Sequence, residues 1–375
     1  MSVPNPPFCA GPPIENSQYF VGRQRELNQL ATFMTADQPT SVNVVGDKRM
    51  GKSSLLRYFV RTYGERLSAS GRTADKYLVV YLSLQEARCQ READFFRAVA
   101  ESLNQRLTLT RPGLKLQFWQ SEWNRMTFAQ ACKHCAEKGV LPVICLDGFK
   151  ELLIYRGAEN FDAGFYNILR SLTQANVLML VIASRESLRV YREQHKINSS
   201  FFNDARKVKL GGLIQSAVQD LVRLPQSLNR QADAALTEAD QKLAAEWGEQ
   251  HPYKLQLAAI CLWEARRNGQ GTAEARWQFD QQLREVALPG MQWRRLRRLI
   301  WDGPVWVGNS VQRVGLRLAD MEAWIKGWVV LLSLGLLVVG VLNREKLGQA
   351  VEKVQQCLAE GAGCLQETEP DDSRP

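Results

Sequence analysis

Short apolar runs alternate with amphipathic stretches through the N-terminal half of the chain. The apolar runs cover residues 42–45, 76–84, 140–147 and 176–184, and a weaker one lies near Val208. Short continuous runs of this kind are typical of strands buried on both faces, as in a parallel sheet. Stretches of helical periodicity follow Gly22, Lys52 and Arg91, and another covers residues 116–138. The alternation predicts an α/β fold with a five-stranded parallel sheet that contains an inserted strand.

Changes in composition predict how the chain is divided. Residues 1–18 are rich in Pro and Gly and are expected to form an extended arm, followed by the sheet domain over 19–225. Helical patterns that begin near Leu236 and at Pro252 predict a helical lid domain over 226–290. The remainder divides into a basic, amphipathic segment (291–326), an apolar segment (327–343) and an acidic tail (344–375).

The apolar segment predicts a single transmembrane helix. Residues 327–342 carry no charged or strongly polar side chain, and residues 324–326 extend the run toward the about 20 residues that cross a bilayer. Trp324 and Trp328 are expected to anchor it at the interface. The alternative is a buried core helix. Basic residues before the run outnumber those after it, which predicts an inner (cell) membrane protein with its main domain in the cytoplasm and its tail outside.

Charge and cysteine content narrow the choice of partners and compartment. The net charge of +9 favours an acidic partner, either nucleic acid or an anionic lipid surface. The 8 cysteines form no dense framework, which indicates a reducing environment for most of the chain, and no signal peptide is visible. Cys357 and Cys364 could form a disulfide if the tail faces an oxidising space. Cys132 and Cys135 are interpreted as ordinary thiols, because a zinc site needs four ligands.

A phosphate-binding loop follows the first apolar run. Gly46, Gly51, Lys52 and Ser53 have the spacing G-x-x-x-x-G-K-S. The glycines allow the backbone to wrap around a phosphate, and the amides through Ser54 can form an anion-binding nest at a helix N-terminus. Lys52 is expected to contact the β- and γ-phosphates of ATP or ADP, and the Ser53 hydroxyl to hold Mg²⁺.

Two later strand ends complete the predicted chemistry. Asp147 ends the run 140–147, where a single carboxylate at the carboxyl edge of the sheet is typical of a Walker B strand that orients Mg²⁺. Arg185 follows the run 176–184 and is expected to stabilise charge on the terminal phosphate. It could equally pair with a carboxylate of a facing helix, and Asp147 could simply cap a helix.

Three segments around this core resemble the STAND class of AAA-like nucleoside triphosphatases. Residues 21–27 are similar to its V-G-R-x-x-E-L entry, residues 210–213 to its L-G-x-L junction, and residues 248–256 to its G-x-H-P lid motif. The resemblance implies that Val21, Gly22 and Arg23 lie beside the base and ribose, and that His251 and Pro252 close over the nucleotide. Ordinary alternatives are an exposed Arg23 and a helix-capping His251.

The sequence departs from this class at one position. Its members commonly carry Asp-Glu at the Walker B strand end, and the glutamate orients the attacking water, whereas this chain has Gly148 after Asp147. Glu151 could replace it only through an unusual turn. Nucleotide binding with slow or absent hydrolysis is therefore expected, and whether the protein is an ATPase enzyme stays open.

The function predicted from these features is a bacterial, membrane-anchored ATP switch that forms a homo-oligomer. A sensor or trigger protein is expected to activate it, and the lipid bilayer is the site of output, as signal or lesion. One alternative is a DNA-binding AAA-like ATPase of the replication or transposition type, with the basic cluster 294–298 on nucleic-acid phosphates. Another is a non-hydrolysing membrane scaffold.

Overall fold

The computed structural model describes residues 6–110, 122–154, 161–226 and 234–286. The chain divides into two compact units, residues 1–288 and 289–375, and all described residues belong to the first. The predicted segments 291–326, 327–343 and 344–375, with the basic cluster 294–298, Cys357 and Cys364, lie outside the described residues. In the described part, no helix combines the length and apolarity needed to span a bilayer.

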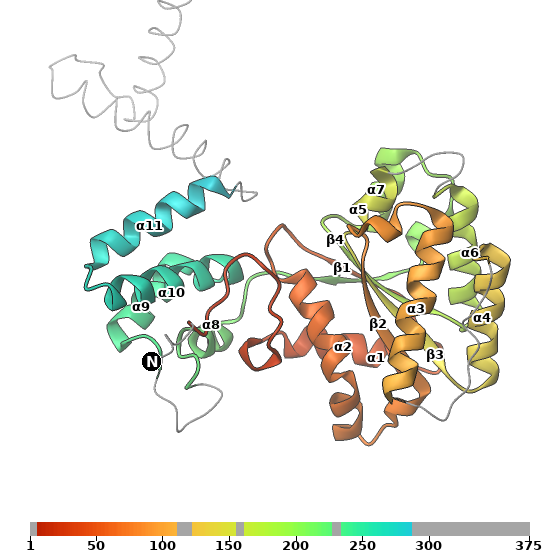
Figure 1. Cartoon of the computed structure of the whole chain (residues 1–375), viewed down its shortest axis with the longest axis horizontal. Helices are drawn as coiled ribbons and strands as arrows, with labels where there is room; N and C mark the ends of the chain where they lie inside the picture. Colours follow the sequence, from red (N-terminus) through yellow and green to blue (C-terminus); the bar gives the residue numbers. More distant parts are fainter. Residues whose placement is uncertain (1–5, 111–121, 155–160, 227–233, 287–375) are drawn as a thin grey trace, which may run out of the picture. The chain divides into compact units, whose positions relative to one another are not determined.

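Five parallel strands form the predicted sheet (Figure 1). Their order is β2-β3-β4-β1-β5, so β4 is inserted between β1 and β3, and β5, the strand expected near Val208, lies at an edge. This result confirms the α/β prediction of a five-stranded parallel sheet with an inserted strand. The strands are β1 (Val42–Val45), β2 (Tyr77–Ser83), β3 (Leu141–Asp147), β4 (Met179–Ser184) and β5 (Arg206–Lys209).

Helices cover both faces of the sheet, because successive strand residues point to opposite sides. Leu78 and Val80 of β2 belong to one buried cluster, whereas Val79 between them belongs to the other. The second cluster lies under α1 (Gln24–Met34) and α2 (Lys52–Ala69). The first is covered by α3 (Glu92–Thr110), α4 (Arg125–Glu137), α5 (Lys150–Ile154), α6 (Ala163–Gln174) and α7 (Leu188–His195). Short 3₁₀ turns occur at Ser17–Tyr19, Ala74–Lys76, Ala87–Cys89 and Ser200–Asn203.

The helix predicted over 116–138 begins later than expected. Of its residues, 116–121 lie outside the described part, and Glu122 to Asn124 are not helical. Asn124 is the N-cap: its side chain accepts from the amides of Met126 and Thr127, and Thr127 Oγ1 accepts from the amide of Asn124. This reciprocal capping box fixes the start at Arg125, and the apolar periodicity does not reveal it.

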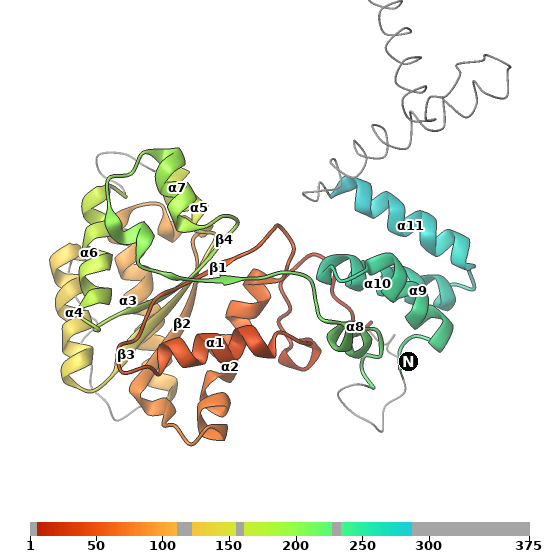
Figure 2. The same ribbon diagram turned by 180° about the vertical axis from the view of Figure 1, so that it is seen from behind.

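Four helices contribute to a third hydrophobic cluster, beside the sheet domain (Figure 2). They are α8 (Gln215–Val222), α9 (Glu238–Gly248), α10 (Pro252–Arg267) and α11 (Thr272–Glu285). Thr237 caps α9, because its hydroxyl accepts from the amide of Asp240. Although α8 precedes the predicted lid boundary at residue 226, Ala217 and Leu221 pack in the same cluster as α9 and α10. We call α8–α11 the helical domain.

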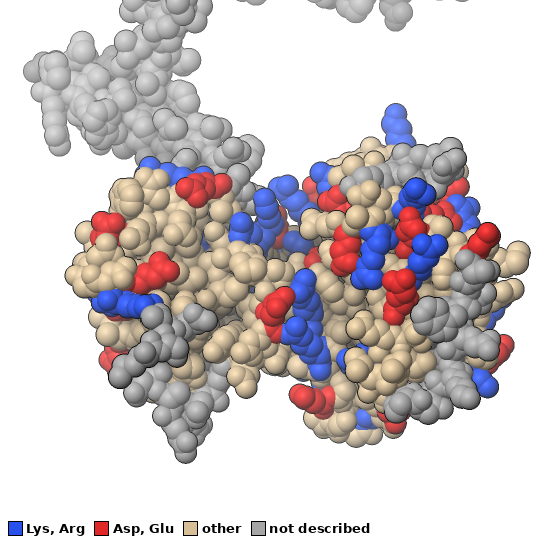
Figure 3. Space-filling model, in the orientation of Figure 1, with Lys and Arg blue, Asp and Glu red and all other residues tan. Residues whose placement is uncertain are grey.

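Cysteines and surface charges bear on the predicted compartment and partners. Cys132 and Cys135 are both buried, and burial raises the pKa of the Cys135 thiol to about 12, so both are packing residues rather than reactive thiols. Within the described residues, no group of three or more His, Cys, Asp or Glu side chains could hold a metal ion. On the face drawn in Figure 3, basic and acidic side chains are interspersed over the sheet domain.

Candidate nucleotide-binding site

The loop after β1 has the conformation of an anion-binding turn. The amide of Gly46 donates to the carbonyl of Ser184 at 3.3 Å, which ties the start of the loop to the end of β4. Two residues then adopt left-handed backbone conformations, Arg49 with φ 65° and Gly51 with φ 87°. Gly51 is the N-cap of α2, so the first amides of this helix are directed toward the loop. This backbone geometry favours the binding of a phosphate group in the loop.

Lys52 lies across the mouth of the loop. Its Nζ donates to the carbonyls of Gly46 and Asp47, at 2.7 Å each. Burial lowers the pKa of Lys52, the nearby carboxylates of Asp147 and Asp47 oppose that change, and Arg185 adds to it. Asp147 and Arg185, the predicted contacts at two other strand ends, therefore both lie within electrostatic reach of Lys52.

Asp147 is held by a tyrosine that the sequence analysis did not select. Tyr81 on β2 donates its hydroxyl to Asp147 Oδ2 at 2.9 Å, and burial followed by the Asp147 charge raises the pKa of Tyr81 to about 12. The guanidinium of Arg57 lies 4.8 Å from the centre of the Tyr81 ring and pairs with Glu15 at 3.0 Å. The only signal in the sequence was the position of Tyr81 on the strand beside β3.

Arg185 directly follows β4 and is exposed. No hydrogen bond or ion pair of its side chain is found among the described residues, so the facing-helix carboxylate considered from the sequence does not appear there. Its backbone is fixed by Asn43, which is buried in β1. The side-chain Nδ2 of Asn43 donates to Ser184 Oγ at 2.7 Å and to the carbonyl of Ile182 at 3.1 Å. The side-chain Oδ1 of Asn43 accepts from the backbone amide of Leu188 at 3.1 Å. Asn43 therefore fixes both ends of the turn that carries Arg185.

The entry segment packs against the loop and α8. A β-carbon on Gly22 would lie 2.7 Å from that of Ala217, so only glycine fits there. Arg23 is 8% exposed, which excludes a solvated side chain. Its guanidinium donates to the carbonyls of Met50, Gly211 and Gly212 at 3.3, 2.6 and 3.3 Å. Burial lowers the pKa of Arg23, and its ion pair with Glu26 opposes that change. Arg23 thus connects the phosphate loop to the junction before α8.

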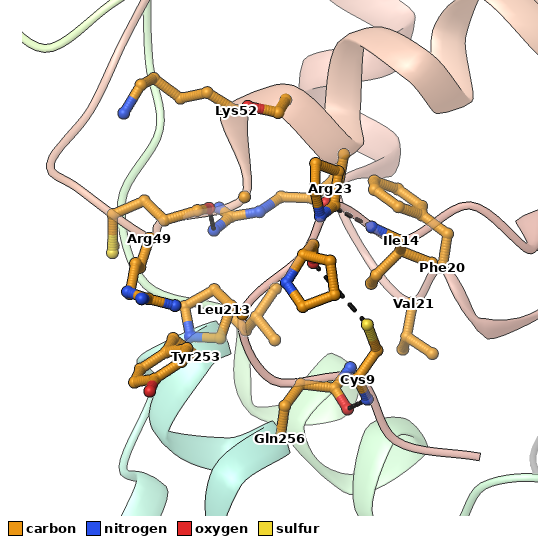
Figure 4. A pocket seen from close by; sticks show the side chains of 18 of the residues that line it. Cys9, Ile14, Phe20, Val21, Arg23, Arg49, Lys52, Leu213, Tyr253 and Gln256 are labelled. Atoms are coloured by element: carbon orange, nitrogen blue, oxygen red, sulfur yellow. Dashed lines mark hydrogen bonds between the residues drawn. The ribbon is translucent and has the colours of Figure 1, made fainter. Parts of the chain in front are cut away.

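A cavity of about 400 Å³ opens beside the loop (Figure 4). Its volume falls within the about 300–1,000 Å³ that is usual for ligand pockets. Of the residues predicted from the sequence, seven line it: Val21, Arg23, Gly51, Lys52, Ser53, Ser54 and Pro252. The other predicted residues do not line it: Gly22, Gly46, Asp147, Arg185 and His251.

The N-terminal arm forms one wall of this cavity. The backbone amide of Ile14 donates to Ser54 Oγ on α2 at 3.1 Å, and the amide of Cys9 donates to Gln256 Oε1 on α10 at 2.9 Å. Pro12 and Pro13 line the cavity between these two contacts. The arm, expected only to be extended, thus bridges the phosphate-loop helix and the helical domain. Its apolar wall suits the flat face of a nucleobase.

The start of α10 forms another wall of the cavity. His251 is the N-cap residue and Pro252 occupies the first turn, as the sequence indicated. The His251 side chain makes no capping hydrogen bond, and burial, followed by the charge of Lys254, lowers its pKa to about 4. Tyr253 and Gln256, which the sequence analysis did not select, face the cavity, and the guanidinium of Arg49 lies 4.2 Å from the centre of the Tyr253 ring.

The side chains present fit a magnesium nucleotide. Mg²⁺ prefers hydroxyl and carboxylate oxygens together with substrate phosphates, which Ser53 and Asp147 can complement. The loop amides and Lys52 provide the cationic surroundings that a polyphosphate requires. A parallel sheet of this strand order, with the loop after β1 and the carboxylate at the end of β3, defines the class of P-loop nucleoside triphosphatases.

Within that class, the chain belongs to a family described as an ATPase domain predominantly from Archaea, whose model matches residues 20–231. The family establishes an AAA-like, ATP-binding P-loop protein, and the STAND class and bacterial origin stay predictions. No curated protein matches the sequence.

Solved structures share the fold. The Walker-type ATPase PABY2304 of Pyrococcus abyssi superposes with a TM-score of 0.54 at 15% identity, over 84% of this chain and 90% of that one. The ORC2 protein of Aeropyrum pernix, solved as ADPNP-ADP complexes, gives 0.51 at 14% identity, over 80% and 79%. At these identities the likeness shows the fold alone.

Proposed function

We propose that the protein is an ATP-dependent switch in which the bound nucleotide sets the position of the helical domain. One observation carries this proposal: a single cavity is lined by the phosphate loop, the entry segment, the arm and α10. A ligand that fills it contacts both domains at once. Loss of its terminal phosphate would change the contacts of Lys52 and of the loop residue Arg49, which touches Tyr253 on α10.

Each predicted side chain has a defined task in this proposal. Lys52 leaves the carbonyls of Gly46 and Asp47 for the β- and γ-phosphates, and Arg185 approaches the terminal phosphate from the end of β4. Bound Mg²⁺ would neutralise the phosphate charge, with the Ser53 hydroxyl and the Asp147 carboxylate as its protein contacts. Val21 and the arm would hold the base. His251, behind Pro252, would stay neutral at physiological pH and pack rather than pair with phosphate.

The output belongs to the proposal as well. We propose that nucleotide-dependent self-association, triggered by a sensor protein, brings together apolar segments 327–343 in the bilayer. The support is the length and apolarity of that segment. The DNA-binding alternative depends on the basic cluster 294–298. The DNA-binding alternative predicts an affinity for DNA that falls steeply as the salt concentration rises. The switch proposal predicts no DNA binding at physiological salt.

The central experiment measures ATP binding and domain position together. Lys52→Ala should raise the Kd for ATP at least about 10-fold, because one phosphate-bound ammonium is lost. Wild-type protein should show protection from hydrogen exchange in α10 on adding ATP, and Lys52→Ala should not. Lys242→Ala on the exposed face of α9 is the control. Full ATP affinity in Lys52→Ala, or ATP binding without any change in α10, would refute the proposal.

Membrane attachment is tested separately. The full-length protein should float with liposomes and resist carbonate extraction, and deletion of 324–343 should abolish both properties. Lys52→Ala should leave them unchanged. A full-length protein that stays in the aqueous phase would exclude the membrane output without affecting the nucleotide switch.

A further inference from the structure

Gly148 lies where a water-orienting group would be expected in this class of site. It directly follows Asp147 and has no side chain, so it cannot hold a water against a phosphate. Hydrolysis needs a group that orients the attacking water and one that accepts its proton. The structure shows what occupies the space beside Gly148.

Two side chains converge on that space. A β-carbon built on Gly148 would lie 3.4 Å from Cγ and 3.9 Å from Cδ of Gln85, and 3.9 Å from Cγ of Glu151. A side chain at position 148 would therefore contact the carboxamide carbon of Gln85 and a side-chain methylene of Glu151, which come from two different segments. Neither makes a side-chain hydrogen bond or ion pair within the described residues.

The backbone explains how Glu151 reaches this place. Gly148 adopts φ 77°, a left-handed conformation that residues with a β-carbon rarely take. The amide of Glu151 then donates to the carbonyl of Gly148 at 2.9 Å, which folds the chain back at the start of α5. This is the unusual turn that the sequence analysis required before Glu151 could act. Glycine at 148 is thus what allows Glu151 to return toward Asp147.

Gln85 is held on the other side by the sheet. Ser83 at the end of β2 is paired with Asp147, and the amide of Leu84 donates to the Asp147 carbonyl at 2.9 Å. Gln85 follows at once and lines the cavity together with Lys52 and Ser53. Its carboxamide therefore lies between the nucleotide cavity and Gly148.

We propose that Gln85 and Glu151 together replace the missing side chain at position 148 and act on the water that attacks the terminal phosphate of ATP. This inference rests on the proposed function. Gln85 orients the water, whose oxygen forms a bond to the γ-phosphorus while the bond to the β,γ-bridging oxygen breaks. The bridging oxygen keeps the electron pair and leaves with ADP. The proton from the water passes to Glu151 and then to solvent.

Single-turnover hydrolysis and ATP binding, measured on the full-length protein, test the pair. Glu151→Gln and Gln85→Ala should each lower the hydrolysis rate at least about 10-fold, a threshold set below the about 100-fold that a positioned proton-transfer group contributes at minimum. Both should leave the Kd for ATP within about 3-fold of wild type, since the proposal places both side chains on the attacking water and not on the nucleotide. Glu246→Gln and Gln219→Ala, on exposed faces of α9 and α8, are the controls.

Conservative variants separate chemistry from structural support. Glu151→Asp, which keeps a carboxylate, should retain more activity than Glu151→Gln, which cannot accept the proton of the water. Gln85→Glu, which keeps a polar group of the same length, should retain more activity than Gln85→Ala. If either substitution lowers thermal stability, these two comparisons still decide the matter.

The failure of this inference differs from failure of the switch. If wild type binds ATP and hydrolyses it, but Glu151→Gln and Gln85→Ala keep the wild-type rate, the inference is wrong and the switch stands. If wild type binds ATP but does not hydrolyse it measurably, the inference is likewise wrong and the switch stands. If wild type does not bind ATP, the proposed function itself fails.

Discussion

Arg49 in the phosphate loop stacks on Tyr253 at the start of α10, with 4.2 Å between the guanidinium carbon and the ring centre. Cation–π contacts of this kind contribute about 0.5–2 kcal/mol, depending on how well water is excluded. The contact links the loop between β1 and α2 directly to the helical domain. A change in the loop therefore has a short physical route to α10.

Breaking this contact should loosen the helical domain. Tyr253→Ala is expected to increase hydrogen exchange in α10 of the ATP-free protein. In a double-mutant cycle with Arg49→Ala, urea unfolding should give a coupling free energy of about 0.5–2 kcal/mol. Tyr253→Phe keeps the ring and should behave as wild type. A coupling free energy near zero would show that the two side chains are neighbours without an energetic link.

His251 should make stability depend on pH. Burial lowers its pKa from 6.5 to about 4 in the folded protein, so the folded state favours neutral imidazole. Between these values the unfolded chain binds a proton that the folded protein does not, and the free energy of unfolding should fall as pH decreases from 6.5 to 4. Partial exposure limits the His251 contribution to about 1–3 kcal/mol.

Urea unfolding at several pH values tests this expectation. His251→Asn cannot titrate in this range and should show a shallower loss of stability between pH 6.5 and 4. His134→Asn is the control, because the His134 side chain on α4 is 40% exposed. Parallel curves for wild type and His251→Asn would contradict the lowered pKa.

The helical domain depends on one buried carboxylate. The Asp240 side chain is 1% exposed and receives two guanidinium nitrogens of Arg266, the closer contact being 2.7 Å. Arg266→Ala would leave this charge buried without its partner, which should cost about 3 kcal/mol in the free energy of unfolding. Arg189→Ala removes an exposed pair with Glu193 on α7 and should change it by less than about 0.5 kcal/mol. Both effects are measured by urea unfolding. Equal losses of stability in the two variants would contradict the expectation that burial of the carboxylate sets the cost.

Asn43 should affect activity through Arg185. Asn43→Leu removes the hydrogen bonds to Ile182, Ser184 and Leu188, and should destabilise the fold by about 2–3 kcal/mol. Because the turn after β4 then loses both of its anchors, the hydrolysis rate should fall even at temperatures where the variant is folded.

A control at the opposite end of the same two strands isolates this effect. Ser41 Oγ accepts from the amide of Leu180 at 3.1 Å, away from the turn. Ser41→Ala should lower the free energy of unfolding by about 1 kcal/mol but leave the hydrolysis rate unchanged. Hydrolysis that falls in proportion to stability in both variants would argue against a positioning role for Asn43.

The sheet and the phosphate loop were predictable because each depends on local pattern. Continuous apolar runs mark buried parallel strands, and the glycine and lysine spacing reflects the backbone geometry of one turn. The start of α4 was predicted too early, since a polar capping box sets it. The side chains that complete the site could not be found in this way. Tyr81 reaches Asp147 only when β2 pairs with β3, and Gln85 and Gln256 line one cavity only when α10 packs beside the sheet domain.

Arg23 makes hydrogen bonds that its motif did not predict. The motif resemblance indicated a contact with base and ribose, and the structure shows hydrogen bonds to three backbone carbonyls. Arg23 lines the cavity as well, so the nucleotide contact stays a prediction. A motif identifies an important side chain, but long-range packing decides which of its donors remain available to a ligand.

The arm that joins α2 to α10 has a practical consequence for work on this protein. The family match begins at residue 20, so a shortened gene could be designed to start at Tyr19. Such a gene would omit Cys9 and Ile14, and with them the hydrogen bonds of the arm to Gln256 and Ser54. Such a fragment could keep an intact sheet while its nucleotide pocket lacks a side. Affinities obtained with it would describe an opened cleft, and a bulky affinity tag fused close to Phe8 would carry the same risk.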